Sequence, residues 1–194
     1  MKRIIGPLLL CLLLCLLLCG CGGAETGNAV QEQYRTVRTA QMEAEVTSHT
    51  SADSRTFTLQ CRYDAAGDSV TTVTAPGELA GLTAIVSGED MTISCDGLQL
   101  PAGASLDVCP ANCLPYLLRA LAEGYVLEQG GEMLEDSPCL RLTLDTTAPG
   151  GDKVLCAVWL DEEGLFPRYA EFSQNEQVVL TAKLLAFTCT TSEG

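Results

Sequence analysis

The sequence has a single histidine, His49, and few aromatic side chains, which make up 5% of its 194 residues. A Ser-His or Cys-His catalytic pair would have to use His49, which stands among serines and threonines where a strand is expected to end. Zinc binding is disfavoured, because Cys109 and Cys113 have a loose metal-like spacing but no comparable second pair follows. Glycine-rich phosphate loops and calcium-loop spacings are missing as well. We therefore expect no catalytic residue, no metal and no cofactor.

Basic residues are also scarce. The chain has 11 lysines and arginines against 25 acidic residues, which gives a formal net charge of −14. Nucleic acid is not an expected partner, because phosphate binding requires a basic face. An anionic lipid surface would repel such a domain, so attachment to a membrane would need a separate anchor.

No apolar run reaches the ~20 residues of a membrane-spanning helix. The stretch from Ile4 to Leu18 is shorter and follows Lys2-Arg3, which is the pattern of a secretory signal. It ends in Leu18-Cys19-Gly20-Cys21, which resembles the lipobox of bacterial lipoproteins. We expect residues 1–20 to be a signal peptide and Cys21 to be lipidated, with palmitate among its acyl chains. This predicts a lipid anchor on the extracytoplasmic face of the cell membrane.

Seven cysteines follow Cys21, and an exported chain can form disulfides. An odd number leaves at least one thiol unpaired, and the pairing of the others cannot be deduced from their order. Several lie on strand faces that are expected to be buried, where a free cysteine acts as a small core residue. Both alternatives remain open at this stage. The seven are Cys61, Cys95, Cys109, Cys113, Cys139, Cys156 and Cys189.

Residues 21–28 are glycine-rich and polar, which predicts a flexible tether after the lipidated cysteine. A single domain is expected over residues 29–190. It begins with a short helix over residues 29–40, because Val30, Tyr34 and Val37 are spaced to share one face.

Most of the remaining chain alternates with period two, which predicts antiparallel strands. The clearest case is residues 55–63, where Phe57, Leu59, Cys61 and Tyr63 share one face. Residues 153–161 are nearly all apolar and predict a central strand buried on both faces. Residues 98–110 contain two prolines and predict a break. The count is about eight or nine strands.

A second helix is expected between Asn112, a good N-cap residue, and Gly124, a C-terminal cap residue. Four leucines in it, at positions 114, 117, 118 and 121, form one apolar stripe. One sheet with helices on one face is the simplest way to bury that stripe. The predicted fold class is therefore α+β, with a long antiparallel sheet that curls around helices on its concave side.

Two segments resemble a known family. The stretch Val158 to Arg168, which reads VWLDEEGLFPR, resembles the strand–turn–strand of the LolA/LolB-like lipoprotein-carrier superfamily, and residues 75–81, APGELAG, resemble the loop after its third strand. In overall layout, the lipidated clostridial germination lipoproteins of the GerS type are the most similar members. The resemblance implies an unclosed half-barrel with helices in its mouth. Among such members, some hold acyl chains and others bind a cell-wall amidase.

Two functions are therefore open. The first is a membrane-anchored, non-catalytic binding module for a cell-wall or germination-related protein. The alternative is a lipid or lipoprotein carrier whose concave cavity holds acyl chains. The residues that would line such a cavity are Phe57, Leu59, Tyr63, Leu117 and Leu121.

Overall fold

An 11-stranded antiparallel sheet dominates the computed structural model of the chain, which describes residues 23–49, 53–88, 90–104, 108–147 and 153–192. The predicted signal peptide and Cys21 lie outside the described residues. Within those ranges, no helix has the length and apolar character that crossing a bilayer requires.

The described part of the chain begins with helix α2 (Gly23–Thr36). Six strands and a short 3₁₀ helix follow it. They are β1 (Val37–His49), β2 (Ser54–Asp64), β3 (Ser69–Ala75), η1 (Gly77–Leu79), β4 (Thr83–Ser87), β5 (Asp90–Cys95) and β6 (Leu98–Ala104). Helix α3 (Cys113–Glu123) follows. The second half consists of β7 (Tyr125–Leu134), β8 (Ser137–Asp145), β9 (Val154–Asp161), β10 (Pro167–Gln174) and β11 (Gln177–Thr191).

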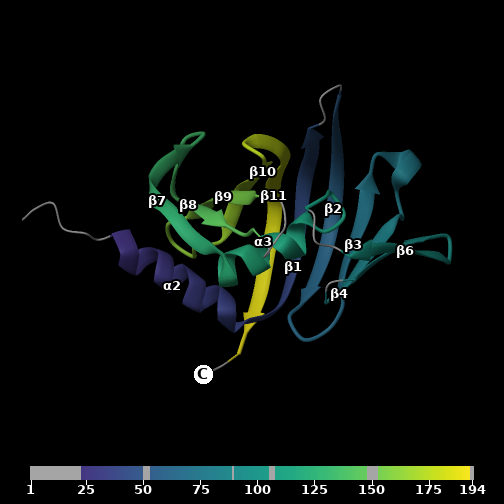
Figure 1. The fold of residues 1–194 in the computed structure, drawn as a ribbon, viewed down its shortest axis with the longest axis horizontal. Helices are drawn as coiled ribbons and strands as arrows, with labels where there is room; N and C mark the ends of the chain where they lie inside the picture. The colour runs from purple at the N-terminus through teal and green to yellow at the C-terminus, as the bar shows by residue number, and fades with distance from the viewer. Residues whose placement is uncertain (1–22, 50–52, 89, 105–107, 148–152, 193–194) are drawn as a thin grey trace, which may run out of the picture.

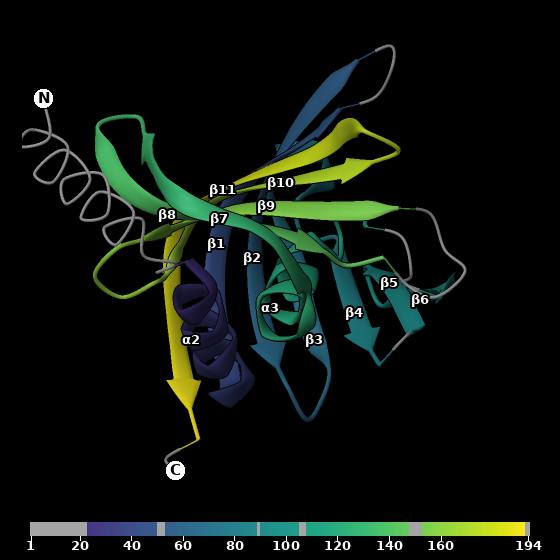
Figure 2. The ribbon, with the colours of Figure 1, turned by 60° about the vertical axis from the view of Figure 1, so that its left-hand side comes forward.

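The strands are ordered β6-β5-β4-β3-β2-β1-β11-β10-β9-β8-β7, so β1 and β11 meet in the middle and β6 and β7 form the two edges. The chain passes from one edge to the other through α3. The sheet curves around both helices (Figure 1), which lie on the same side of it in front of β1, β2 and β3 (Figure 2). The predicted class, α+β with a curved, unclosed half-barrel and helices on the concave face, is confirmed.

Alternation of apolar and polar residues fixes which face of the sheet is concave. In β1, Met42, Ala44 and Val46 are at most 3% exposed, while Gln41 before them and Glu45 between Ala44 and Val46 are exposed. Antiparallel partners share a face, and the partner of Met42 on β2 is Cys61, which is also buried. The predicted inward positions of Met42, Ala44 and Val46 on β1 and of Cys61 on β2 are therefore confirmed.

The leucine stripe of α3 fills the concave side. Leu114, Leu117, Leu118 and Leu121 are at most 2% exposed and belong to the main core. Asn112 occupies the N-cap position, and its side-chain oxygen accepts a hydrogen bond from the Cys109 amide at 2.8 Å. The structure confirms both the predicted bounds of this helix and its packing role.

Side chains of α2 hold the two helices together. The end of α3 leaves backbone carbonyls without helical partners, as every helix does. Arg35 donates to the carbonyl of Ala122 at 3.0 Å, and Gln31 donates to that of Gly124 at 2.5 Å. The Tyr34 hydroxyl donates to the carbonyl of Leu165, in the β9–β10 turn, at 2.8 Å. These bonds connect α2 to both α3 and the sheet.

Gly124 ends α3, as predicted, but for a different physical reason. Its φ of −62° lies outside the left-handed region that favours glycine at helix ends. A Cβ atom at this position would lie 2.6 Å from the carbonyl oxygen of Ala120 and 3.1 Å from the Cβ of Leu144. Glycine is required here because the helix end passes close to backbone and to β8.

The Gly124→Ala variant is expected to be destabilised by about 1–3 kcal/mol, because backbone must move to admit the new methyl group. The matched control is Gly130→Ala in β7, where an added Cβ meets no atom within 4 Å. Urea unfolding should show a lower midpoint for Gly124→Ala and a nearly unchanged one for Gly130→Ala. Equal midpoints would refute the steric explanation.

The predicted first helix and tether need correction. Helix α2 already begins at Gly23 and ends at Thr36, whereas residues 23–28 were expected to be a flexible tether. Gly27 is buried against β7, where an added Cβ would lie 2.5 Å from the side-chain oxygen of Gln129. Here glycine serves close packing, not flexibility. Val37, expected in the helix, is the first residue of β1.

Two strands were not predicted. Residues 98–104, expected to be irregular, form β6, and β7 was not anticipated at all. The two prolines of residues 98–110 suggested a break, but a sheet edge tolerates Pro101 and the positive φ of Gly103 because one side of an edge strand needs no partner. The adjacent Gly130 and Gly131 weaken the strand signal of β7 in the same way, and β7 is the other edge.

Candidate functional site

An apolar pocket of about 190 Å³ opens on the concave side next to α3; we call it the concave pocket. Phe57 and Leu59 of β2 and Ile93 of β5 line it from the sheet. Leu79, at the end of η1, and Pro110, just before α3, complete the wall. Such a lining offers contacts to hydrocarbon and almost no hydrogen-bonding group.

The predicted cavity residues separate into three groups. Phe57 and Leu59 line the concave pocket. Leu117 and Leu121 are 0% exposed and pack in the core between α3 and the sheet. Tyr63 lines a separate hollow of about 150 Å³. The structure therefore does not bring the five residues together around one space, and ligand binding by any of them stays a prediction.

The hollow beside Tyr63 lies between the β2–β3 turn and α3. Tyr116 and Arg119 of α3 form part of its wall, and the Arg119 guanidinium stacks over the Tyr116 ring at 5.3 Å. Burial raises the pKa of the Tyr63 hydroxyl above its usual value. This hollow is lined by more polar groups than the concave pocket, whose lining is apolar.

All seven cysteines after Cys21 carry free thiols, which settles the alternative left open by the sequence. Cys109 lines the concave pocket, and Cys61 and Cys113 are buried in the main core. Burial raises the pKa of Cys61 to about 11, and burial raises the pKa of Cys113 as well. Protonated thiols of this kind are weak nucleophiles and pack as small apolar groups.

His49 lies at the end of β1, as expected. Its Nδ1 lies 3.2 Å from the Ser54 hydroxyl and its Nε2 lies 3.3 Å from the Thr181 hydroxyl. These contacts connect β1 with β2 and β11 at the rim of the sheet. In the described ranges, no three His, Cys, Asp or Glu side chains are grouped so that they could hold a metal ion.

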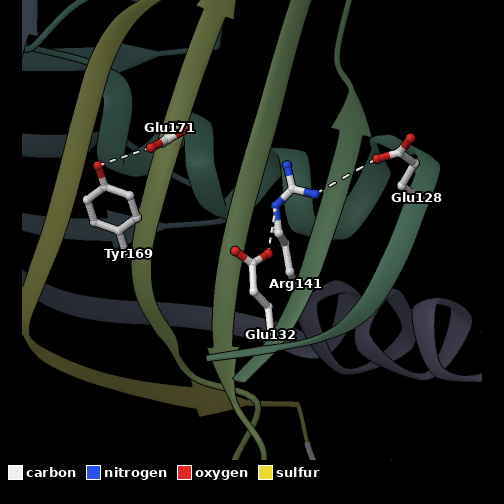
Figure 3. Close-up of polar contacts among 5 residues, drawn as sticks. All are labelled: Glu128, Glu132, Arg141, Tyr169 and Glu171. Atoms are coloured by element: carbon white, nitrogen blue, oxygen red, sulfur yellow. Dashed lines mark hydrogen bonds and ion pairs between the residues drawn. The ribbon is translucent and has the colours of Figure 1, made fainter. Parts of the chain in front are cut away.

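The convex face near β7 carries an arginine between two glutamates (Figure 3). The Arg141 guanidinium lies 3.8 Å from a Glu128 carboxylate oxygen and 3.4 Å from one of Glu132. It also stacks over Trp159 of β9 at 5.1 Å. Exposed ion pairs contribute little, so the main effect is to cover the indole ring.

Trp159 is the centre of a small second core on this convex face. It packs with Cys139 and Ala157, and its ring centroid lies 5.3 Å from that of Tyr169. The Tyr169 hydroxyl donates to Glu171 at 3.2 Å (Figure 3). Two larger but shallower hollows lie on the convex side. The one over β7 and β8 is lined mainly by polar groups, and the one across β3, β2, β1 and β11 by a mixture of polar and apolar side chains. Neither offers an enclosed apolar site.

Sequence reasoning identified one wall of the concave pocket and missed the others. Residues from η1, β4, β5 and the segment before α3 were not selected. The period-two pattern that places Met91, Ile93 and Cys95 on one face carried a usable signal for β5. Nothing local indicates that Leu79 and Pro110 line the same pocket as Ile93, because both lie in segments that connect the strands and helices.

Comparisons with solved structures show the same fold elsewhere. A DUF1329 family protein from Desulfovibrio piger superposes with a TM-score of 0.52 at 13% identity, covering 88% of this chain and 94% of that one. An uncharacterised conserved protein from Thermus thermophilus gives 0.52 at 10% identity, covering 88% and 89%. A LolA superfamily protein from Nitrosomonas europaea gives 0.46 at 13% identity, covering 86% and 94%. No family model and no curated protein matches the chain. At these identities the first two similarities, with TM-scores above 0.5, establish the fold alone.

Proposed function

We propose that this chain is a membrane-anchored bacterial lipoprotein whose half-barrel is a non-catalytic binding module for a protein of the cell envelope. The observation that carries the proposal is the filling of the concave face. Helices α2 and α3 occupy the side of the sheet on which a carrier would hold its cargo, and their inward side chains are buried in the core.

The small volume of the concave pocket favours a protein partner as its occupant and disfavours a whole lipid. Pockets that enclose drug-sized ligands measure about 300–1,000 Å³. The concave pocket has about 190 Å³, which is nearer to the ~150 Å³ of an engineered cavity that binds benzene. It is large enough for one bulky apolar side chain of a partner or the end of one acyl chain, and too small for a diacylated molecule.

The anchor would hold the domain close to the bilayer. If Cys21 is lipidated, one residue, Gly22, separates it from the start of α2. Because α2 is bonded to α3 and to the β9–β10 turn, a lipid on Cys21 would fix the rest of the domain near the membrane surface as well. A partner that acts on the cell wall would then be recruited to the membrane. The resemblance stated above makes a cell-wall hydrolase, with a role in germination, the expected class.

Metabolic labelling tests the anchor. Cells that express the full-length chain should incorporate an alkyne analogue of palmitate into it, and the protein should fractionate with membranes. The Cys21→Ala variant should lose the label and leave the membrane fraction, while Cys95→Ala, at an exposed cysteine of the domain, should keep both. Equal labelling of the Cys21→Ala variant would refute the predicted anchor.

Cross-linking in growing cells tests the binding role. Purification of the cross-linked chain under denaturing conditions should enrich one envelope protein relative to an unrelated lipoprotein of similar abundance. Recovery of the same proteins with both would count against a specific partner.

One observation favours the alternative function, an acyl-chain carrier: the lining of the concave pocket is almost wholly apolar. If this alternative holds, the protein should bind a fluorescent fatty acid saturably. The Ile93→Trp variant, whose larger side chain fills the pocket, should then lose that binding. The absence of saturable binding to the unmodified protein would remove the alternative.

A further inference from the structure

An exposed apolar ledge extends the concave pocket toward the β6 edge. Leu98 and Leu100 of β6 are 73% and 67% exposed, which is unusual for two leucines on one strand face. Strand register places them on the concave side: Leu100 pairs with Ile93, and Leu98 pairs with Cys95, two residues further along β5. Since Ile93 lines the concave pocket, pocket and ledge form one continuous apolar surface, the wing groove.

The helices do not cover this surface. Helix α3 packs against β2 and β8, and α2 packs against α3 and β7. In both ribbon views β6 lies to the side of α3, at the end of the sheet far from α2 (Figures 1 and 2). Contiguous exposed apolar surface next to a pocket indicates an interaction site, unlike isolated exposed leucines.

The charge around the wing groove has one sign. Between Arg62 and Arg119 the sequence contains no lysine, arginine or histidine, and this segment includes the whole of β3 to β6. Its acidic residues within the described ranges are Asp64, Asp68, Glu78, Asp90 and Asp96. Glu78 directly precedes Leu79 of the pocket wall, and Asp96 stands in the turn that leads to Leu98.

The cations on the flanking elements do not line the concave pocket. Arg55 of β2 lies 3.9 Å from a carboxylate oxygen of Asp53, Arg62 lines a hollow on the convex side, and Arg119 stacks over Tyr116 at the hollow beside Tyr63. The field over the wing groove is therefore negative, and it favours a cationic partner over an anionic one.

We propose that the wing groove docks an amphipathic, cationic segment of a protein partner, which places one apolar side chain in the concave pocket, packs others on Leu98 and Leu100, and turns lysines or arginines toward the acidic rim. A helix laid in an apolar groove is a common mode of peptide recognition. The inference rests on the proposed function, because it names the surface and the chemistry by which the binding module takes its partner. Anionic phospholipid is the disfavoured occupant, because its head groups would meet Glu78 and Asp96.

Two synthetic peptides of opposite charge test the proposal. Both carry leucines at helical spacing on one face; one has lysines on the other face and the second has glutamates. The full-length protein is reconstituted in phosphatidylcholine nanodiscs, and binding of each fluorescent peptide is measured by anisotropy with empty nanodiscs as background. We expect saturable binding of the lysine peptide and much weaker binding of the glutamate peptide.

Variants then locate the binding surface. The double variant Leu98→Asp and Leu100→Asp should bind the lysine peptide about tenfold or more weakly, because the apolar contacts are lost. The added negative charge attracts the peptide but does not replace those contacts. The control pair, Met133→Asp and Leu185→Asp, adds the same charge at side chains that are 60% and 50% exposed on β7 and β11. It should change the affinity by less than about twofold. Circular dichroism verifies that both variants are folded.

A charge variant tests the rim. Glu78→Lys combined with Asp96→Asn should lower the affinity for the lysine peptide and raise the affinity for the glutamate peptide. Asparagine is chosen at position 96 because the φ of 49° there suits it.

Three results would overturn the proposal. Equal affinity for the lysine and the glutamate peptide would refute the electrostatic argument. An equal loss of affinity in both pairs of aspartate variants would show that the peptide does not bind at Leu98 and Leu100. If the Leu98→Asp and Leu100→Asp pair instead abolished binding to phosphatidylglycerol vesicles or dissociated a dimer, a lipid or a second copy would be the occupant. The proposed function is tested separately, since enrichment of a partner by cross-linking in cells does not depend on either peptide.

Discussion

Raising the pH from about 8 to about 10.5 is expected to lower the free energy of unfolding by about 4 kcal/mol through two buried thiols, Cys61 and Cys156. Burial raises the pKa of Cys61 from 9.0 to about 11 and that of Cys156 from 9.0 to about 12. At about pH 10.5 both thiols are ionised in the unfolded chain and largely protonated in the folded one. Each then disfavours folding by about 2 kcal/mol, at 1.36 kcal/mol per pH unit above the unfolded pKa.

The direction follows from proton uptake. A raised pKa means that the folded state holds a proton that the unfolded state has lost, so stability falls as the pH rises. The full contribution is present below about pH 9 and is lost progressively between pH 9 and 12. Cys113 acts in the same direction, because its pKa is also raised by burial. So does Tyr34, whose buried hydroxyl also has a raised pKa and donates to the Leu165 carbonyl.

Urea unfolding across this pH range measures the effect. A variant with Cys61→Ala and Cys156→Ala should be less stable at about pH 8, because two buried sulfur atoms are removed, but its stability should fall less steeply with pH. The Cys95→Ser variant, altered at an exposed thiol, should keep the slope of the unmodified protein. Identical slopes for all three proteins would show that the thiols do not control the alkaline loss of stability.

Replacing Leu117 by alanine is expected to cost about 2–5 kcal/mol of unfolding free energy. Leu117 is 0% exposed and lies in the leucine stripe of α3, in the core between this helix and the sheet. Truncation leaves a cavity that cannot close easily, because hydrogen bonds from α2 hold the carbonyls of Ala122 and Gly124 at the end of α3. A domain with a typical stability of about 5–15 kcal/mol would lose a large part of it.

The matched control is Leu185→Ala on β11, at a leucine that is 50% exposed. Surface substitutions of this kind usually change stability by less than about 0.5 kcal/mol. In thermal unfolding, the midpoint temperature of Leu117→Ala should fall by about 2–4 °C for each kcal/mol of lost stability, and that of Leu185→Ala should hardly change. A small effect at Leu117 would mean that α3 does not fill the concave face as described, and the choice of binding module over carrier would lose its basis.

Local patterns in the sequence were sufficient for the central part of the fold. The alternation in β1 and β2 and the leucine stripe of α3 each arise from one continuous segment whose burial follows from its own periodicity. Edge strands carry a weaker pattern because only one side of each is paired, which is why β6, with Pro101, and β7, with Gly130 and Gly131, were not predicted.

The candidate site was harder to predict because it is assembled from distant segments. Leu59 and Phe57 could be selected from the pattern of β2, but the opposite wall comes from η1 and from residues just before α3. The same limit applies to Gly27 and Gly124. In sequence these glycines indicate flexibility or a left-handed cap, whereas in the structure both serve close packing, against β7 and β8. Only the folded arrangement distinguishes those roles.

Native mass spectrometry of the protein extracted from membranes tests the central claim most directly, namely that the half-barrel is occupied by its own helices and is held at the membrane by a lipid on Cys21. We predict the mass of a chain that begins at Cys21 and carries covalent acyl groups, with no further lipid bound. A stoichiometric, dissociable lipid on the folded domain would contradict the claim and identify the protein as a carrier.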